Sequence, residues 1–358
     1  MARRARTGPR RVSQADVARH AGVSPGIVSS VINGRDYGSI RVSDATRARV
    51  MESVRELGYV PDIAARNLAG GSSRLIGVFT YEALFPLGSQ SFYHDFLVGI
   101  EEAADEAEYH LLLVTGAKNE DRRRSIYAGG VNHLRLADGG LLLGTNEQTD
   151  EIVRLAGEGY PFVFVGERSF PGVELSYVAG DYVGGTAALV GRAVELGHRR
   201  IAMAQLQPDE PIPGRQTGFR TGREQYGLAA EDAPLLPVSL GPTPGRLSLD
   251  DFLAEIVRRD ITAVILENNG FVEPFRAAAR ERGLDIPADL SLIALGGTQF
   301  RPENAGLTEL RIPRYEMGAE AVRLLLRLMA DPSGGPLRTR LSCGILEGET
   351  LAPPPVRA

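Results

Sequence analysis

The sequence of 358 residues predicts a small all-α module at the N-terminus, followed by a larger α/β core of two doubly wound lobes. Three observations predict this division. Helix-capping residues recur between residues 12 and 60, short apolar runs alternate with amphipathic stretches in residues 74–345, and the net charge changes sign near residue 74. Residues 1–74 carry a formal net charge of +7, and the remaining residues carry −12. A basic module on an acidic body favours a polyanionic partner for the module, with a solubilising basic tail as the alternative.

The N-terminal module begins with a pattern typical of two short helices joined by a tight turn. Ser13 can cap the first helix, and Gly22 can end it in a left-handed turn. Ser24 can cap the second helix, in which Pro25 occupies the first turn, where its missing N–H costs no hydrogen bond. Two short helices with a glycine in the turn form a helix-turn-helix motif.

A third helix is expected after Ser43, which is placed to cap it. Val50, Val54 and Leu57 recur at helical spacing, and Gly58 can end the helix. This helix can pack its apolar face against the first two and complete a small three-helix domain.

Two stretches of this module resemble the lac repressor (LacI/GalR) family of bacterial transcriptional regulators. They are VSQADVARHAGVSPGIVSSVING, from residue 12, and RVSDATRARVMESVRELGYVPDIAARNLAGGSS, which ends at residue 73. The resemblance implies a helix-turn-helix DNA-binding domain at residues 12–60, whose helix from Ser24 to Ile32 enters the major groove. The basic arm that precedes it, residues 1–11, is expected to be disordered without DNA and can follow the DNA backbone.

The resemblance also implies a set of residues that lie close to DNA. Each of them can read bases, and the alternatives are that it contacts a phosphate or only faces solvent. They are Ser13, Ser24, Pro25, Gly26, Ser29, Ser30, Asn33, Arg41 and Leu68. Of these, four are expected to face outward from the second helix: Pro25, Gly26, Ser29 and Ser30. The arginine that the family usually has at the position of Ser30 is absent, so base readout by a bidentate arginine is not expected there. The long connection that ends at Arg41 is either a source of phosphate contacts or a plain surface loop.

Residues 61–73 are expected to form a hinge helix or linker. Pro61 blocks continuation of the third helix, and residues 62–69 can form about two turns, which are marginal alone. The resemblance implies that this helix forms when two subunits pair on DNA and that Leu68 then wedges into the minor groove. Such insertion costs a few kcal/mol per unstacked base step. The alternative is a plain linker with a buried leucine.

The rest of the chain alternates strands with helices, which indicates parallel sheets covered on both faces. Strands are expected at residues 75–79, 110–114, 139–143, 162–165, 201–206, 263–267 and 291–295, and helices at residues 96–108, 185–196, 215–226, 249–258 and 272–282. So many strands do not readily form a single sheet, so two similar lobes are expected.

Several stretches of this region resemble the family's sensor core, which is similar to periplasmic sugar-binding proteins. They include LGHRRIA, GRQTGFR, GLDIPADLSLIAL and LTELRIPRYEMGAEAVRLLL. The resemblance implies a periplasmic-binding-protein-like, effector-binding and dimerisation core at residues 74–345, followed by a C-terminal tail at residues 346–358. It further implies that the chain crosses three times between the lobes and that a ligand lies between them, beyond the carboxyl ends of the strands.

Arg215 matches the family arginine that holds the effector, with a surface ion pair as the alternative. The aromatic pair Phe92–Tyr93 either flanks the ligand or belongs to the core. The full set of effector-binding residues that the resemblance implies is Phe92, Tyr93, Glu167, Arg215, Asn268, Asn269 and Gly296. Acidic residues usual in the family are absent at Asn268–Asn269 and at Gly296–Gly297, which puts a sugar effector in doubt and favours an anionic, bulkier or absent ligand.

These features together predict an allosteric regulator, with a repressor as the expected sign, that binds a pseudo-palindromic operator in double-stranded DNA as a homodimer. The effector would be a sugar, a sugar phosphate or an organic acid. No cofactor, metal or membrane partner is expected. A single cysteine, Cys343, fits a cytoplasmic protein. A solute-binding protein or an α/β enzyme on the same core fold is the alternative, but no export signal, Walker A loop or Gly-x-Ser-x-Gly elbow is found.

Overall fold

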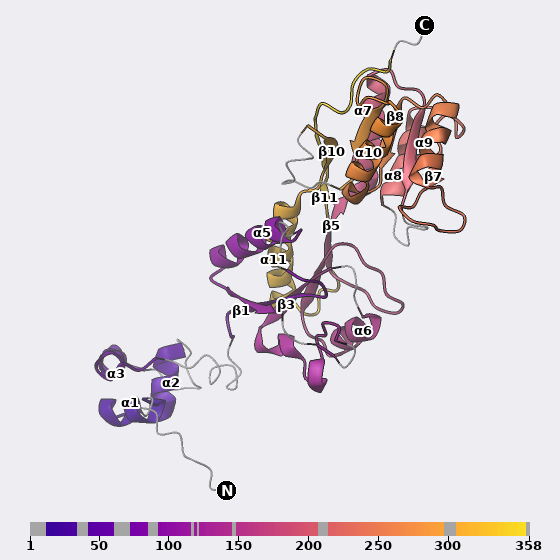
Figure 1. The fold of residues 1–358 in the computed structure, drawn as a ribbon. Helices are drawn as coiled ribbons and strands as arrows, with labels where there is room; N and C mark the ends of the chain where they lie inside the picture. Colours follow the sequence, from indigo (N-terminus) through magenta and orange to yellow (C-terminus); the bar gives the residue numbers. More distant parts are fainter. Residues whose placement is uncertain are drawn as a thin grey trace. The chain divides into compact units, whose positions relative to one another are not determined.

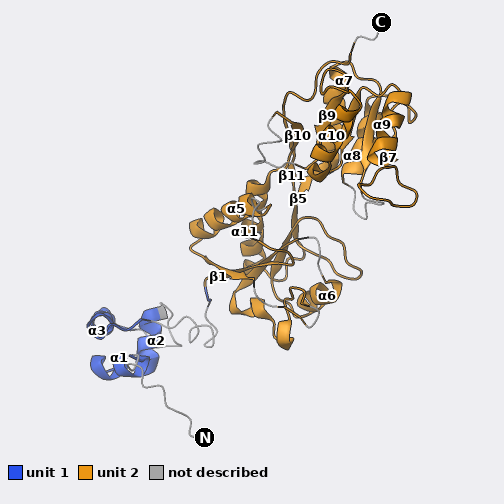
Figure 2. Ribbon diagram, viewed as in Figure 1, with its two compact units in different colours: residues 1–73 blue, residues 74–358 orange. Residues whose placement is uncertain are grey.

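The chain forms two compact units, residues 1–73 and residues 74–358, and each is described by itself (Figure 2). The computed structural model describes most of the chain, with gaps between the described segments. These segments are residues 12–33, 42–60, 72–84, 92–115, 118–119, 122–144, 148–206, 214–296 and 306–355. No described helix is both long enough and apolar enough to cross a lipid bilayer.

The described residues of the first unit form three helices, α1 (Gln14–Ala21), α2 (Pro25–Asn33) and α3 (Asp44–Glu56). The expected caps are present. Ser13 accepts a hydrogen bond from the backbone N–H of Asp16 at 3.3 Å, and Gly22 ends α1 with a φ of 64°. Ser43 caps α3 in the same way. One small core lies between the helices and consists of Val17, Ala18, Ala21, Val28, Val31 and Val50.

The first lobe of the second unit is built on a six-stranded parallel sheet with the strand order β11-β5-β4-β3-β1-β2 (Figure 1). Its strands are β1 (Leu75–Thr80), β2 (His110–Val114), β3 (Gly139–Leu143), β4 (Phe162–Val165), β5 (Tyr177–Asp181) and β11 (Arg338–Ser342). Helices α5 (His94–Glu106) and α11 (Arg314–Ala330) cover one face of the sheet, and α6 (Thr149–Gly157) covers the other with the short turns η1 (Ala128–Gly130) and η2 (His133–Leu136).

The second lobe repeats this plan with the strand order β12-β10-β9-β8-β6-β7. Its strands are β6 (Ile201–Gln205), β7 (Leu235–Pro237), β8 (Ala263–Leu266), β9 (Ser291–Ala294), β10 (Thr308–Arg311) and the antiparallel β12 (Gly344–Leu346). Helices α7 (Tyr182–Glu195) and α8 (Arg215–Gln225) cover one face, and α9 (Leu249–Arg258) and α10 (Val272–Glu281), with η3 (Asn269–Phe271) before it, cover the other.

The chain passes between the lobes three times: from β5 to α7, from β10 to α11 and from β11 to β12. The crossing segments pack tightly against one another. A Cβ added at Gly180 would lie 3.1 Å from Sγ of Cys343, and one added at Gly185 would lie 2.8 Å from Cβ of Cys343. The β5 and β10 crossings leave from the carboxyl ends of their strands, so the carboxyl ends of both sheets face each other across the crossings.

The two-lobed α/β fold with a helix-turn-helix module is confirmed, but several element boundaries differ from the sequence prediction. Helix α7 begins at Tyr182 rather than Gly185, because the side chain of Asp181 accepts a hydrogen bond from Gly184 N at 2.9 Å and caps it. Helix α6, helix α11 and strands β5, β7, β10, β11 and β12 were not among the predicted elements.

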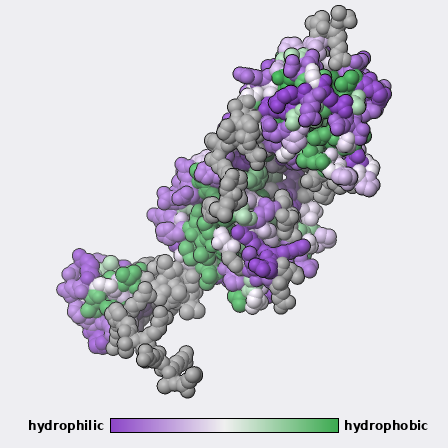
Figure 3. Space-filling view, viewed as in Figure 1, coloured by the Kyte–Doolittle hydropathy of each residue, from purple (hydrophilic) through white to green (hydrophobic). Residues whose placement is uncertain are grey.

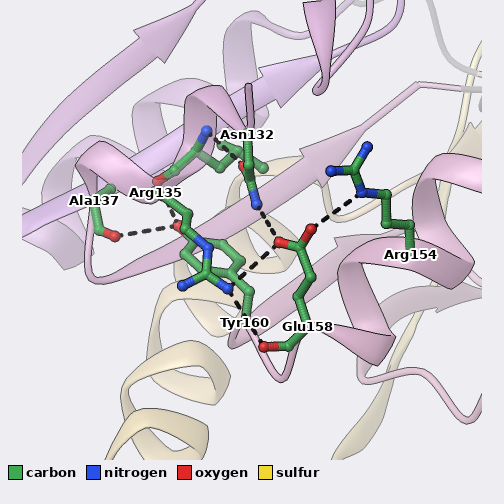
Figure 4. A network of polar contacts seen from close by, with 7 residues as sticks. Asn132, Arg135, Ala137, Arg154, Glu158 and Tyr160 are labelled. Carbon is green, nitrogen blue, oxygen red and sulfur yellow. Dashed lines mark hydrogen bonds and ion pairs between the residues drawn. The ribbon is translucent and has the colours of Figure 1, made fainter. Parts of the chain in front are cut away.

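A network of polar contacts lies at the end of the first lobe where β3 and β4 begin (Figure 4). Glu158, which follows α6, accepts hydrogen bonds from Asn132 Nδ2 at 3.1 Å and from Arg154 Nε at 3.2 Å. Arg135 of η2 also contacts Glu158, at 3.4 Å. The hydrogen bond from Asn132 and the two guanidinium groups hold the pKa of Glu158 below its usual value. The network ties η2 to α6 on one face of the sheet.

Residues after 346, expected as a tail, pack on the second lobe. The side chain of Thr350 accepts a hydrogen bond from Thr308 N at 2.9 Å and donates one to Leu292 O at 2.7 Å. The carbonyl oxygen of Ala352 is 2.8 Å from Nε2 of His198, which is fully buried. The segment as far as residue 352 is therefore packed into the second lobe and is not a free tail.

Candidate functional site

Helix α2 presents its N-terminal turn to solvent. Ser24, Pro25 and Gly26 are exposed, and Ser29 is half-buried. The hydroxyl of Ser24 accepts a hydrogen bond from Ile27 N at 3.4 Å, so this serine serves as a helix cap as well as a surface group. Three exposed small residues leave the backbone of this turn accessible to a large partner.

Ser30 does not face outward as predicted, because only 5% of its surface is exposed. It lies three residues after Ile27, and residues at that spacing share one face of a helix. Ile27 packs against the core of the first unit. The small side chain of Ser30 therefore lies at the edge of the helix face that is buried against this core. The predicted outward set is correct for the first turn and wrong for Ser30.

Two of the predicted DNA-binding residues, Arg41 and Leu68, lie outside the described residues. Asn33 ends α2, but its side chain also lies outside what is described. Ser13 is exposed, and its hydroxyl donates to Oδ2 of Asp16 at 2.7 Å.

A second group of predicted residues meets at the carboxyl ends of β8 and β9. Arg215, the first residue of α8, donates from Nε to the carbonyl oxygen of Leu295 at 2.6 Å. Its guanidinium carbon lies 4.5 Å above the centroid of the Tyr182 ring. A Cβ added at Gly296 would lie 3.9 Å from Nη2 of Arg215 and 3.6 Å from Oδ1 of Asn269. The structure therefore brings Arg215, Asn269 and Gly296 together.

Asn268 plays a supporting part at this end of the second sheet. Its side chain accepts a hydrogen bond from Gly270 N at 2.9 Å and so caps η3. This turn carries Asn269, whose Nδ2 donates to Oε2 of Glu309 at 3.2 Å.

Two charged residues that were not among the predicted site residues complete the group. Glu309, on β10, is 4% exposed, and Arg314, the first residue of α11, is 5% exposed. The guanidinium carbon of Arg314 lies 4.8 Å from the centroid of the Phe92 ring. Burial lowers the pKa of Arg314, while Tyr182, Asp95 and Glu309 oppose that shift and the like charge of Arg215 adds to it. Arg314 is therefore within electrostatic range of Arg215.

The two residues of the aromatic pair have different surroundings. Phe92 is 59% exposed and lies under Arg314, whereas Tyr93 is 5% exposed. The hydroxyl of Tyr93 donates to Glu82, and burial raises the pKa of Tyr93 with a further contribution from that hydrogen bond. Tyr93 thus belongs to the first lobe's core, and Phe92 is the member that faces the charged group.

Glu167 is engaged elsewhere. Its carboxylate accepts two hydrogen bonds from Arg340, at 2.6 and 3.1 Å, and a third from the hydroxyl of Tyr177 at 3.0 Å. The pair joins β11 to the end of β4. Within the described segments Glu167 makes no hydrogen bond or ion pair with Arg215, so the structure does not bring this predicted residue into the group.

Six residues make up what we call the interlobe cluster, which brings together cationic, acceptor and aromatic groups. They are Phe92, Arg215, Asn269, Gly296, Glu309 and Arg314. A guanidinium can donate two parallel hydrogen bonds to a carboxylate or phosphate, and a buried carboxylate can accept from hydroxyl groups. Among the described segments, no group of three His, Cys, Asp or Glu side chains is placed to hold a metal ion.

Comparison with known proteins gives matches over nearly the whole chain. The family model described as bacterial regulatory proteins, lacI family, matches residues 14–62, and the periplasmic binding protein-like domain matches residues 190–351. The HTH-type transcriptional regulator MalR of Streptomyces coelicolor is 30% identical over 325 residues, which cover 87% of this chain and 88% of MalR. Catabolite control protein A of Priestia megaterium is 27% identical over 320 residues, which cover 88% of this chain and 91% of that protein.

Solved structures align over a similar length. A transcriptional regulator CelR in complex with cellobiose is 27% identical, with a TM-score of 0.59, and the alignment covers 95% of this chain and 100% of CelR. The lac repressor dimer bound to operator and the anti-inducer ONPF is 21% identical, with a TM-score of 0.67 and coverage of 96% and 100%. The likeness to the lac repressor structure supports the fold described above for this chain.

Proposed function

The chain belongs to the lacI family of bacterial regulatory proteins and is a DNA-binding transcriptional regulator, and from this premise we propose how it works. A homodimer binds a pseudo-palindromic operator, and a small molecule held at the interlobe cluster controls the affinity for that operator. The expected sign of regulation is repression. We place the protein in the cytoplasm, where its DNA target would lie.

The observation that carries the DNA-binding part is the exposed N-terminal turn of α2 in a capped helix-turn-helix. Backbone N–H groups at a helix N-terminus favour phosphate oxygens, and the small side chains of Ser24, Pro25 and Gly26 allow close approach. No arginine stands on this helix, so sequence selection would depend on Ser29, on shape readout and on the wedge supplied by Leu68.

Pairing of two subunits is supported by an apolar surface on the first lobe. Strand β2 is the edge strand of its sheet, and its Leu113 is 41% exposed. Val98, on the neighbouring helix α5, is 39% exposed. Figure 3 shows hydrophobic residues gathered on the visible face of this lobe. An exposed apolar edge strand tends to pair with another chain, and a two-fold pair would present two helix-turn-helix units to a two-fold DNA site.

Control by a small molecule is supported by the position of the interlobe cluster. Its residues come from both lobes and from the β10–α11 crossing, so a bound molecule would favour one arrangement of the lobes over others. A ligand can shift such an equilibrium only through its different affinity for the two arrangements. The CelR relative holds cellobiose in its solved structure, which supports a small-molecule effector here.

The test is to purify the full chain and a chain lacking residues 1–73 from bacterial cells and to sequence the DNA that co-purifies with each. The full chain is expected to enrich fragments that share an inverted repeat, and the shortened chain is expected to enrich none. An absence of any shared repeat with the full chain, or equal enrichment by both chains, would contradict the proposal.

A further inference from the structure

The arrangement around Gly296 indicates what chemistry a ligand would meet. A Cβ at this position would make only ordinary contacts, 3.6 Å from Oδ1 of Asn269, 3.7 Å from Cα of Asn268 and 3.9 Å from Nη2 of Arg215. There is room for a small group here, but glycine supplies no side chain to meet the guanidinium. Within the described segments, no carboxylate of the protein forms an ion pair with Arg215.

The Arg215 side chain is held in place from its other side. Its Nε donates to Leu295 O, and the Tyr182 ring supports one face of the guanidinium. These two contacts hold the guanidinium group in place, and its Nη2 lies 3.9 Å from the position that a Cβ on Gly296 would take. A fixed guanidinium loses little freedom when it binds a planar or tetrahedral oxyanion.

Arg314 adds a second cation to the same region from a different part of the chain. It is buried at the start of α11, and the Phe92 ring supports its guanidinium. Its burial and its like charge with Arg215 both disfavour the charged form. An anion between the two would be attracted by both guanidinium groups in surroundings that screen charge poorly.

The cluster also offers acceptors for neutral hydroxyl groups. Glu309 is buried beside Asn269, which donates to one of its oxygens, Oε2. A carboxylate has about four acceptor sites, so Glu309 can accept further hydrogen bonds from a ligand. A site that combines two cations with such an acceptor suits a molecule with both an acidic group and hydroxyl groups.

We propose that the effector is a hydroxylated acid, whose carboxylate or phosphate lies between Arg215 and Arg314 beside Gly296 and whose hydroxyl groups donate to Glu309. The proposal rests on the proposed function, since it names the ligand class of that same site. Arg215 belongs to the second lobe and Arg314 follows a crossing into the first, so the acidic group would link the two lobes directly.

The test follows the thermal unfolding of the full chain at constant ionic strength, with chloride as the reference anion. The probes are glucose, glucuronate and glucose 6-phosphate, which share a ring and differ in their acidic group. At least one of the two acids is expected to raise the unfolding midpoint saturably, whereas glucose is not. The acid that does so distinguishes a carboxylate ligand from a phosphate ligand.

Substitutions test whether the acid binds at the interlobe cluster. Arg215→Gln and Arg314→Gln are each expected to weaken the acid response at least about tenfold, because each removes a charge-assisted donor. Arg220→Gln, on the exposed side of the same helix α8, is the matched control and should respond like the natural chain. Gly296→Asp should abolish the response by pairing with Arg215, whereas the isosteric Gly296→Asn should only weaken it.

Three results would overturn the inference. These are no shift by either acid beyond the chloride reference, an acid response that survives in both arginine variants, or a saturable glucose response that Arg314→Gln leaves unchanged. Operator binding by the ligand-free chain, measured in parallel, tests the proposed function separately. A chain that binds acid but no DNA would contradict only the proposed function, and one that binds operator but only neutral sugar would contradict only this inference.

Discussion

At the scale of single residues, the buried charges at the crossings have the greatest consequence. Moving an ion out of water costs several kcal/mol, and the cost is recovered only with good partners. Arg314 has the Phe92 ring, a contact worth about 0.5–1 kcal/mol because the ring is largely exposed, and the nearby carboxylates of Asp95 and Glu309. Buried charges such as Arg314 and Glu309 lower stability by this desolvation cost, so their place beside a crossing is better explained by ligand binding than by stabilisation of the fold.

Cys343 lies on a crossing and offers a chemical probe of it. Burial raises the pKa of Cys343 to about 11, with Asp181 adding to the shift and the two arginines opposing it. Because the thiolate is the reactive form, about 100-fold less of it is present at pH 8 than in a cysteine with the usual pKa of 9.0. The rate of alkylation by iodoacetamide is therefore expected to be low at pH 8 and to keep rising beyond pH 9.

Alkylation can be followed by mass spectrometry, since the chain has one cysteine. The urea-unfolded chain is the control, and its rate should level off above pH 9. A folded-state profile that also levels off near pH 9 would show that the crossing is more open to water than its packing indicates.

Part of the interlobe cluster could be predicted from the sequence, and part could not. The resemblance to the lac repressor family pointed to Phe92, Arg215, Asn269 and Gly296, which match positions of the family's effector site. Glu309 and Arg314 were missed because their burial depends on the β10–α11 crossing, which local periodicity does not reveal. A carboxylate inside the apolar run LTELRI was the available signal for Glu309.

At the scale of elements, the crossing of α5 and α11 sets the geometry of the aromatic side of the cluster. Phe92 immediately precedes α5, and Arg314 begins α11. The helices meet through Gly99 and Gly318, since a Cβ added at either glycine would collide with backbone of the other helix, at Tyr315 and Phe96. Backbone contact of this kind fixes the separation of the helices and, through it, the distance between Phe92 and Arg314.

Gly318→Ala is expected to lower the free energy of unfolding by about 1–3 kcal/mol, because the added methyl forces α5 and α11 apart. The effect should appear in urea denaturation, together with a weaker acid response at the interlobe cluster. Gly157→Ala is the matched control: this glycine lies in α6, and a Cβ there meets nothing within 4 Å. The control is expected to be neutral or stabilising by up to about 1 kcal/mol. Equal effects of the two substitutions would contradict the close crossing.

Element prediction succeeded where a pattern was strong and local. The caps at Ser13 and Ser43 and the left-handed Gly22 depend on neighbouring residues, and all three are present. Strand β11 was not predicted because its residues alternate between exposed and half-buried positions at the edge of a sheet. Its pairing partner, β5, is more than 150 residues earlier, so no local pattern could indicate the match.

At the scale of the whole molecule, charge is divided between the two units. The first 74 residues carry +7 and the rest −12, so DNA should be attracted to the first unit and repelled by the second. Operator affinity is expected to fall about 10³–10⁵-fold between 50 and 200 mM salt if six to ten phosphates are contacted. Fluorescence anisotropy with labelled operator measures this dependence. An affinity that is unchanged over this range would argue against phosphate contacts by the basic unit.

The three crossings also bear on how the protein is made. Five of the six strands of the first lobe have been synthesised by residue 181, but α11 and β11 come only after the segment that builds most of the second lobe. At about 5–20 residues per second, a ribosome needs about 7–30 seconds to pass from residue 181 to residue 330, where α11 ends. During that time the apolar face that α11 will cover stays open on the nascent chain. The lobe that is begun first is therefore finished last, and a chain that terminates before α11 would leave that face open to chaperones and to aggregation.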